Sequence, residues 1–196
     1  MFLNHTGTQT IETQRLILRR FEIADTESVF QTWLSDPVVQ NNYGEKACNT
    51  TVEARQIIEK WISQYNNNEF YRWAIILKGI DTSIGQIAFH FVDSKNQRAD
   101  VEYCIGQSYW GNGYAAEALN AVIEYAFKHI RLNRVQAFHR SKNAASGKVL
   151  EKVGMKYEGV LKQYLIHNDE FDDCIMYAAI RNEWNGKEIA KHNNRA

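Results

Sequence analysis

Hydrophobic and polar positions alternate, or recur at helical spacing, along most of the chain. Seven segments have the alternating or short apolar pattern of strands: 15–21, 71–77, 83–92, 98–105, 134–140, 157–166 and 170–180. Four segments have apolar residues at helical spacing: from 25 to before 37, 51–65, 113 to about 130, and 144–153. Short turns should make the strands within 71–105 and within 157–180 antiparallel neighbours. The order of strands and helices predicts a mixed α/β (α+β) layer fold.

Capping residues and the single proline indicate where the first two helices begin and end. Asp25 can cap the first helix, which we expect to stop before Pro37 because proline pushes the preceding residue out of the helical region. A polar loop is expected over residues 41–49. Thr50 and Glu53 then form the capping-box pattern that predicts the start of the second helix.

The composition is typical of one globular domain. The 196 residues suffice for a single core, expected over about 10–184, with 1–9 and 185–196 as loose termini. Lys plus Arg equals Asp plus Glu at 23 each, so no net charge attracts nucleic acid or a membrane surface. No apolar run approaches about 20 residues and residues 1–10 lack a signal-peptide core, so we expect a cytoplasmic protein. The three widely spaced cysteines indicate reduced thiols, and no metal site is expected.

A turn that contains two glycines follows the strand at 98–105 and leads into a helix. Gly111 and Gly113 lack a Cβ, so the backbone there can adopt unusual dihedral angles and approach a ligand closely. Small Ala115 and Ala116 leave further room beside the turn. The first amides of a helix have no intrahelical acceptor and lie at the positive end of the helix dipole. Such a turn is a candidate site for a diphosphate.

Three interpretations of this turn compete on the residues alone. A triphosphate-binding loop needs Gly-Lys and then Ser or Thr after the glycines, which the chain lacks. Residues 111–116 fit the G-x-G-x-x-A dinucleotide fingerprint. However, they lie past the middle of the chain, and the next strand ends in His139 and Arg140 instead of an acid. The third interpretation is an ordinary strand-to-helix turn.

The order of several motifs favours a fourth interpretation. Trp-Gly-Asn-Gly-Tyr-Ala-Ala-Glu-Ala at 110–118 resembles the acetyl-CoA motif of the GNAT N-acetyltransferases. The similarity is greatest to the ribosomal-protein N-terminal (RimJ/RimL-type) acetyltransferases. Further segments resemble that branch in its opening strand, its second cofactor segment and its closing hairpin: 13–19, 143–146 with 150–155, and 158–163 with Asp173 and Tyr177.

The resemblance implies a fold, an activity and a co-substrate. The fold is a mixed, mostly antiparallel seven-stranded sheet with about four flanking helices, splayed between the fourth and fifth strands. The activity is transfer of acetyl from acetyl-CoA to a primary amine by direct attack in a ternary complex, with the pantetheine arm in the splay. The residues implied to bind acetyl-CoA or coenzyme A are Tyr103, Cys104, Ile105, Trp110, Gly111, Asn112, Gly113, Tyr114, Ala115, Ala116, Asn143, Ser146 and Lys148.

Candidate catalytic groups are two acids and one hydroxyl. Asp100 and Glu102 share one face of a strand, and either carboxylate can take the proton of the attacking amine, directly or through water. Glu102 is nearer the expected thioester, but the family often has glycine there and an acid at position 100, so the base stays open. Ser146 matches the serine that the ribosomal-protein enzymes place beside the CoA sulfur as a donor, and on its own is also a first-turn helix hydroxyl. Those enzymes have an acid where this chain has Leu165.

The acceptor is less well defined. A protein N-terminal amine, with a pKa of about 8, needs less help from a base than a lysine at about 10.4. The alternatives are a small-molecule amine (amino acid, polyamine or antibiotic) and a non-catalytic CoA-binding module. The family also allows a homodimer. The acids of the closing hairpin predict that it faces a cationic acceptor: Glu158, Asp169, Glu170, Asp172 and Asp173.

Overall fold

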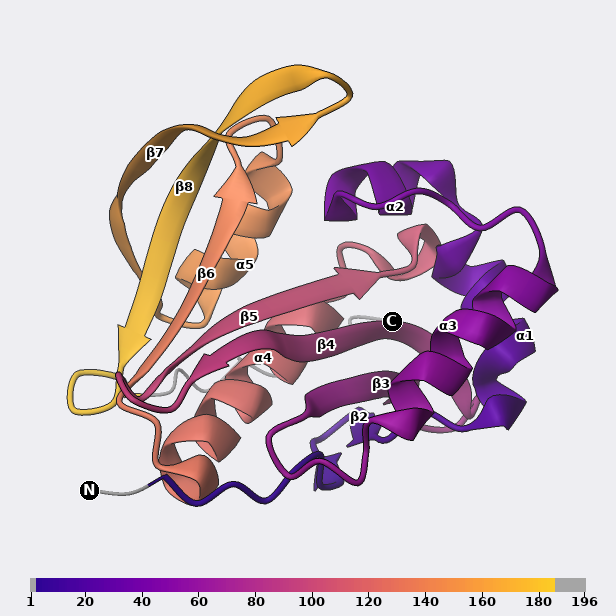
Figure 1. Ribbon diagram of the computed structural model, residues 1–196, viewed down its shortest axis with the longest axis horizontal. Helices are drawn as coiled ribbons and strands as arrows, with labels where there is room; N and C mark the ends of the chain where they lie inside the picture. The colour runs from indigo at the N-terminus through magenta and orange to yellow at the C-terminus, as the bar shows by residue number, and fades with distance from the viewer. Residues whose placement is uncertain (1–2, 186–196) are drawn as a thin grey trace, which may run out of the picture.

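The alternating segments of the sequence form one eight-stranded sheet (Figure 1). The computed structural model describes residues 3–185 of the chain. Neighbouring strands follow the order β1-β2-β3-β4-β5-β6-β8-β7, and all pairs are antiparallel except β5 with β6. The expected mixed, mostly antiparallel sheet is confirmed, with one strand more than the seven expected. The strands are β1 (Ile11–Glu12), β2 (Leu16–Arg19), β3 (Tyr71–Leu77), β4 (Thr82–Asp93), β5 (Arg98–Ile105), β6 (Arg134–Arg140), β7 (Lys156–His167) and β8 (Glu170–Ile180).

Helices connect the strands at the places that the helical spacing predicts, with one addition. The short helical segments η1 and η2 flank α1, and η4 continues α4 to residue 130. The α-helices are α1 (Thr26–Val29), α2 (Pro37–Tyr43), α3 (Thr51–Ser63), α4 (Tyr114–Tyr125) and α5 (Ala144–Lys152). The shorter segments are η1 (Ile23–Asp25), η2 (Phe30–Leu34), η3 (Gln107–Tyr109) and η4 (Ala126–Ile130).

Helix α2 was not expected, because Pro37 was interpreted only as a stop. The preceding helical segment does end before Pro37, but a new helix starts at the proline itself. Proline suits the first helical position because the N–H it lacks would have no intrahelical acceptor there. The Asp36 carboxylate caps this helix by accepting from the N–H groups of Val38, at 2.8 Å, and Val39. The polar loop expected over 41–49 is therefore helical as far as Tyr43.

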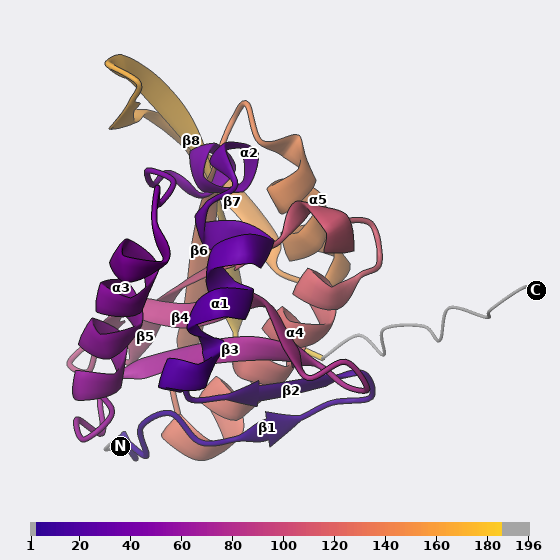
Figure 2. The same ribbon diagram turned by 90° about the vertical axis from the view of Figure 1, so that its right-hand side faces the viewer.

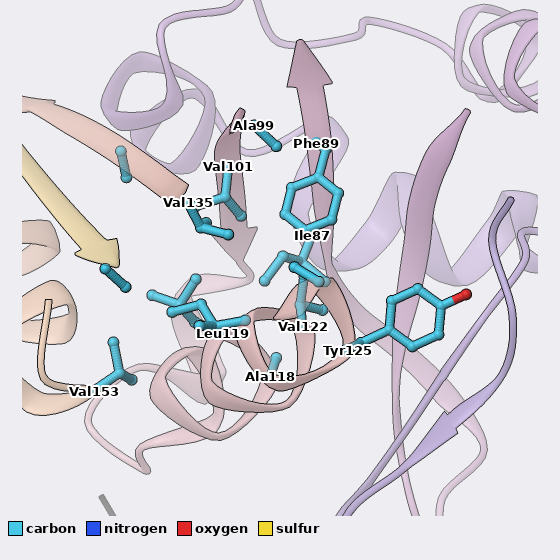
Figure 3. Packing of buried hydrophobic residues seen from close by; sticks show 14 of the residues in the cluster. Ile87, Phe89, Ala99, Val101, Ala118, Leu119, Val122, Tyr125, Val135 and Val153 are labelled. Carbon is cyan, nitrogen blue, oxygen red and sulfur yellow. The ribbon is translucent and has the colours of Figure 1, made fainter. Parts of the chain in front are cut away.

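The sheet is covered by helices on both faces, and each interface has its own core (Figure 2). Helices α4 and α5 pack on one face, where Leu119 of α4 lies among strand residues such as Val101 (Figure 3). Segments η2 and α3 pack on the other face, where Trp33 and Ile58 contact the side of β3 that presents Ala74. All five of these side chains are buried.

Strands β5 and β6 are paired over only part of their length. Their parallel register covers Arg98–Asp100 against Arg134–Gln136 and then stops, so the two strands diverge from there on (Figure 1). These are the fourth and fifth of the seven strands expected from the sequence, so the expected splay is confirmed. Beyond Asp100, the backbone edge of β5 that faces β6 has no strand partner within residues 3–185.

The segment before β1 is more ordered than a loose lead-in. The Asn4 N–H donates to the Ile130 carbonyl at 2.9 Å, and the buried Thr8 hydroxyl donates to the Phe70 carbonyl at 3.0 Å. These bonds attach residues 3–9 to the body of the fold. The expectation for the C-terminal tail falls almost entirely on 186–196, which lie outside the described residues. Among the helices within 3–185, none is both long and apolar enough to cross a membrane.

Candidate functional site

The divergence of β5 and β6 opens a cavity of about 710 Å³. One wall comes from β5 and the turn that follows it, and the opposite wall comes from β6 and α5. The cavity is also lined by residues 165–167 of β7 and, from α2 and its C-cap, by Val39, Asn42, Tyr43 and Gly44. With the exception of Asn112, every residue that the sequence singled out for cofactor binding or catalysis lines this one cavity.

The turn of residues 111–116, here called the glycine turn, presents unpaired backbone amides. Gly111 and Gly113 have φ angles of 79° and 80°, a left-handed conformation that favours glycine. Helix α4 starts directly afterwards, at Tyr114. Within residues 3–185, the N–H groups of Gly111 through Ala116 donate to no protein acceptor. Unpaired amides at a helix N-terminus form a site for an anion.

Lysine side chains from α5 add positive charge to the cavity. Lys148 and Lys152 both line it, and a Cβ built on Gly113 would lie 3.5 Å from the Lys152 Nζ. Both lysines belong to a basic stretch of the sequence, residues 128–156, whose composition alone does not show which of its cations meets the turn. Lys152 does so because it lies one helical turn after Lys148 on α5.

Ser146 and Tyr103 meet across the cavity through their hydroxyl groups. The Tyr103 hydroxyl lies 2.9 Å from the Ser146 Oγ and 3.1 Å from the Ser146 carbonyl oxygen. Ser146 is held in the first turn of α5, where its own N–H bonds to the Asn143 side-chain oxygen at 3.3 Å. Burial raises the pKa of Tyr103 well above its usual value, and the contact with Ser146 offsets this only in part. Tyr103 therefore stays a hydroxyl donor at ordinary pH.

Glu102 is held in a network on the opposite face of β5. The Arg72 Nη2 donates to the Glu102 carboxylate at 2.8 Å, and Arg72 also donates to the Gln86 side chain. Gln86 in turn donates to the Tyr43 hydroxyl at 2.6 Å. Burial, with the nearby Glu102 charge as the next cause, raises the pKa of Tyr43 well above its usual value. His90 completes the surroundings, with its Nδ1 3.8 Å from the carboxylate.

Asp100 lies at the end of the cavity where β5 and β6 are still paired. It forms the last paired position between β5 and β6, opposite Gln136. Its Oδ1 is buried and has no hydrogen-bond partner among the described residues. The two candidate carboxylates thus differ in kind, because Glu102 is ion-paired and Asp100 retains an unpaired oxygen beside the cavity.

Cys104 also lines the cavity, but its thiol is buried. Burial raises the pKa of this thiol well above its usual value, which disfavours the thiolate that a nucleophile requires. Cys48 and Cys174 are likewise free and buried.

Helix α2 spans the open end of the splay. The Asn41 carbonyl accepts from the buried Arg140 of β6. The Asn41 side-chain oxygen lies 2.8 Å from the His167 Nε2 and accepts from Asn168 at 3.2 Å, both in the β7–β8 hairpin. Tyr43 of the same helix accepts from Gln86 of β4, so the unexpected helix joins the two halves of the sheet and also lines the cavity.

The acids of the closing hairpin are largely paired within the protein. Four of the five form ion pairs: Glu158 with Arg134, Glu170 with Lys142, Asp172 with Arg140 and Lys142, and Asp173 with Lys162. Arg134 lowers the pKa of Glu158, and Lys142 followed by Arg140 lowers that of Asp172. The hairpin consequently offers much less unpaired negative charge to a cationic acceptor than its composition suggests.

Sequence reasoning missed the partners of Glu102. Arg72 is 30 residues away from Glu102 along the chain, and the two strands that present them are separated by β4. Tyr43 was missed because it lies on α2. The register of the sheet was needed to find Arg72, while the Asp-Pro pair at 36–37 was a usable signal for the helix.

Comparisons with known proteins agree with this geometry. The family model described as acetyltransferase (GNAT) domain matches residues 15–156. The uncharacterised N-acetyltransferase p20 of Bacillus licheniformis is 32% identical over 178 residues, covering 91% of this chain and 99% of that protein. The ribosomal-protein-serine acetyltransferase of Escherichia coli is 34% identical over 100 residues, covering 51% of this chain and 56% of that protein. A crystal structure of a GNAT-family acetyltransferase from Bacillus anthracis has a TM-score of 0.78 at 30% identity, covering 89% and 99% of the two chains.

Proposed function

The chain belongs to the GNAT acetyltransferases and is an acetyl-CoA-dependent N-acetyltransferase, and we propose that its preferred acceptor is the N-terminal amine of a protein. The observation on which the proposed site rests is the splayed cavity, which brings the unpaired amides of the glycine turn, the free edge of β5 and the Ser146 hydroxyl to one space.

In the proposed site, the glycine turn binds the diphosphate of acetyl-CoA. Its six successive N–H groups have no acceptor among the residues that the structure describes, and Lys152 adds a cation beside Gly113. Diphosphate oxygens accept well from such amides, and the helix dipole of α4 favours their charge. A Cβ at Gly111 would meet none of the described residues within 4 Å, so the turn is open at this position.

The pantetheine arm is proposed to lie along β5. Its amide groups can pair with the β5 backbone beyond Asp100, which faces β6 without pairing with it. This orientation runs from the glycine turn toward the middle of β5 and brings the thioester between Ser146 and Glu102, which line the same cavity.

The proposed reaction is a direct attack of the neutral amine on the thioester carbon. A C–N bond forms, the C–S bond breaks with its electron pair staying on sulfur, and the amine nitrogen loses one proton. A β5 amide near Cys104 or Ile105 is suited to stabilise the oxyanion, and Ser146 to donate to the leaving sulfur. Glu102 or Asp100 accepts the amine proton, directly or through water, and the thiolate is protonated from water.

The acceptor end of the cavity favours an acceptor without several charges. Val39, Leu165 and Ile166 line it together with the neutral amide of Asn42. Most hairpin acids are already paired, so a polyamine or polycationic antibiotic would find little compensation there. The relative from Escherichia coli is a ribosomal-protein-serine acetyltransferase, which supports a protein terminus as acceptor. A small-molecule amine is the second candidate.

A thiol-release assay with a matched acceptor panel tests this proposal. Short peptides with a free N-terminus should release coenzyme A and gain an acetyl group at the α-amine by mass spectrometry. The same peptides with a blocked N-terminus and an internal lysine are the control and should give no release. Turnover only with amino acids, polyamines or antibiotic amines would favour the second candidate. Calorimetric binding of acetyl-CoA without turnover on any amine would indicate a non-catalytic module.

A further inference from the structure

The hydroxyl groups of Ser146 and Tyr103 lie within hydrogen-bond distance of each other. The two side chains come from opposite walls of the cavity, Tyr103 from β5 and Ser146 from α5, and their hydroxyl oxygens are 2.9 Å apart. The Tyr103 hydroxyl is also within 3.1 Å of the Ser146 carbonyl oxygen. Tyr103 has one hydroxyl hydrogen and therefore donates well to one of these two acceptors at a time.

The two choices have different consequences for the serine hydrogen. If Tyr103 donates to the Ser146 carbonyl, the serine hydrogen is free to turn to the tyrosine oxygen, and both hydrogens are used within the protein. If Tyr103 donates to the Ser146 Oγ, the serine hydrogen must point elsewhere, and the cavity that Ser146 lines is the open direction. In the second arrangement the two hydroxyls form a chain that ends in a donor.

A negative charge in the cavity selects the second arrangement. A hydrogen bond to a charged acceptor is shorter and about twice as strong as one between neutral groups. The charge that develops on sulfur as the C–S bond breaks would therefore draw the serine hydrogen toward it, and the tyrosine hydrogen would follow to the Oγ. No proton leaves either hydroxyl in this step, and the sulfur takes its proton from water.

We propose that Tyr103 is a positioning residue that directs the Ser146 hydroxyl hydrogen toward the leaving sulfur. This role rests on the proposed acetyl transfer and adds a second residue to it. Tyr103 acts only through Ser146, so its effect must disappear when the serine hydroxyl is absent. A tyrosine that merely packed β5 against α5 would matter equally with or without that hydroxyl.

The test is a double-mutant cycle with Tyr103→Phe, Ser146→Ala and the double variant, in steady-state kinetics with acetyl-CoA and the best acceptor. Ser146→Ala should lower kcat by about 10- to 100-fold, the range for a hydrogen bond to a charged group. Tyr103→Phe should lower kcat by about 3- to 10-fold, with the calorimetric Kd for acetyl-CoA changed by less than about twofold. In the Ser146→Ala background, Tyr103→Phe should change kcat by less than about twofold. Tyr157→Phe, at an exposed tyrosine of β7 outside the cavity, is the matched control.

An unchanged kcat in Tyr103→Phe, or the same fold loss in both serine backgrounds, would overturn the role while the wild-type activity stood. A wild-type protein that released no thiol with any amine would overturn the proposed function, and the role with it. Replacement of Tyr103 by 3-fluorotyrosine covers the case in which phenylalanine disturbs folding, because ring and hydroxyl are kept and only donor strength changes. Its kcat should differ from wild type when Ser146 is present and not in the Ser146→Ala background, whereas equal effects in both would contradict the proposal.

Discussion

The Arg15 guanidinium and the Glu117 carboxylate form an ion pair directly beside the glycine turn. The Arg15 Nη2 and Nε lie 2.6 and 2.7 Å from the Glu117 Oε2, and the Arg15 Nη1 donates to the Asn112 carbonyl at 2.9 Å. The guanidinium carbon also lies 4.6 Å from the centre of the Tyr114 ring. One side chain, from the residue just before β2, thus contacts the turn, Tyr114 at the start of α4, and Glu117.

The Arg15→Ala substitution should weaken acetyl-CoA binding by about tenfold and lower the free energy of unfolding by about 1–3 kcal/mol. Without Arg15, the nearly buried Glu117 carboxylate has no cation and repels a diphosphate bound at the same helix start. Calorimetry with acetyl-CoA and urea denaturation measure the two effects. Adding Glu117→Gln to Arg15→Ala should restore part of the affinity, because the repelling charge is removed.

The control for this experiment is an ion pair of similar geometry on the surface. Arg55 and Glu59 are 2.8 Å apart on α3, and both are about half exposed. Arg55→Ala should cost less than about 0.5 kcal/mol and leave acetyl-CoA binding unchanged. Equal losses of affinity in Arg15→Ala and Arg55→Ala would show that the contact with the turn is not what matters.

The Gly113→Ala substitution should separate backbone strain from ligand binding. Gly113 has a φ of 80° and Gly79, in the β3–β4 turn, has a φ of 91°. Alanine at either position should cost about 1–2 kcal/mol of stability, because a Cβ disfavours the left-handed conformation. Only Gly113→Ala should also weaken acetyl-CoA binding, since Gly79 lies away from the cavity. A Kd that is unchanged in Gly113→Ala would count against the diphosphate site.

The strands could be predicted from sequence with good accuracy because their patterns are bounded by turns. The expected limits 71–77, 98–105, 134–140 and 170–180 coincide with β3, β5, β6 and β8. Each of these segments is rich in apolar or β-branched residues and is flanked by polar or glycine-containing turns. Helix α2 lacked such a pattern, because its seven residues include only two buried side chains, Val39 and Gln40.

The sequence predicts those parts of the candidate site that lie within one continuous segment of the chain. The glycine turn and the first turn of α5 are local, and the residues named there, except Asn112, do line the cavity. The splay came from family resemblance, since periodicity is silent on how two strands diverge. The partners of Glu102 depend on the register of β3, β4 and β5, which places Arg72 opposite Ala88 and Ala88 opposite Glu102. Residues so distant along the chain leave no local signal.

Two carboxylates remain candidates for the base, and pH dependence should separate them. The Glu102→Gln and Asp100→Asn variants are compared by kcat/KM for the acceptor between about pH 6.5 and 9. The substitution that removes the base should lower the rate by about tenfold or more near neutral pH, and the deficit should shrink as pH rises, because an α-amine with a pKa of about 8 then loses its proton unaided. The other substitution should give a deficit that does not vary with pH. Because Glu102 is ion-paired with Arg72, Glu102→Gln should also lower the stability of the fold, and thermal unfolding measures that loss.

Alkaline pH should destabilise the fold through two buried tyrosines, Tyr65 and Tyr71. Burial raises the pKa of each from the ordinary 10.0 to about 12. Above pH 10 the unfolded chain therefore loses these protons while the folded chain keeps them, so the unfolded state binds fewer protons and stability falls as pH rises. The contribution is complete below about pH 10 and is lost as the pH rises through about 12. Urea denaturation at pH 8, 10 and 11 measures this slope.

The Tyr65→Phe variant makes that assignment specific. The Tyr65 hydroxyl donates to the Arg72 carbonyl at 3.0 Å and accepts from the Phe21 N–H at 2.9 Å, so its removal should cost about 1 kcal/mol near neutral pH. The same variant should lose less stability than wild type between pH 10 and 11, because one of the two groups that oppose ionisation in the folded state is gone. Tyr157→Phe, at an exposed position, should keep the wild-type slope. The Tyr65→Phe variant lacks the hydroxyl that should resist ionisation. If its free energy of unfolding fell with pH as steeply as that of wild type over this range, the alkaline loss of stability would have to arise from other groups.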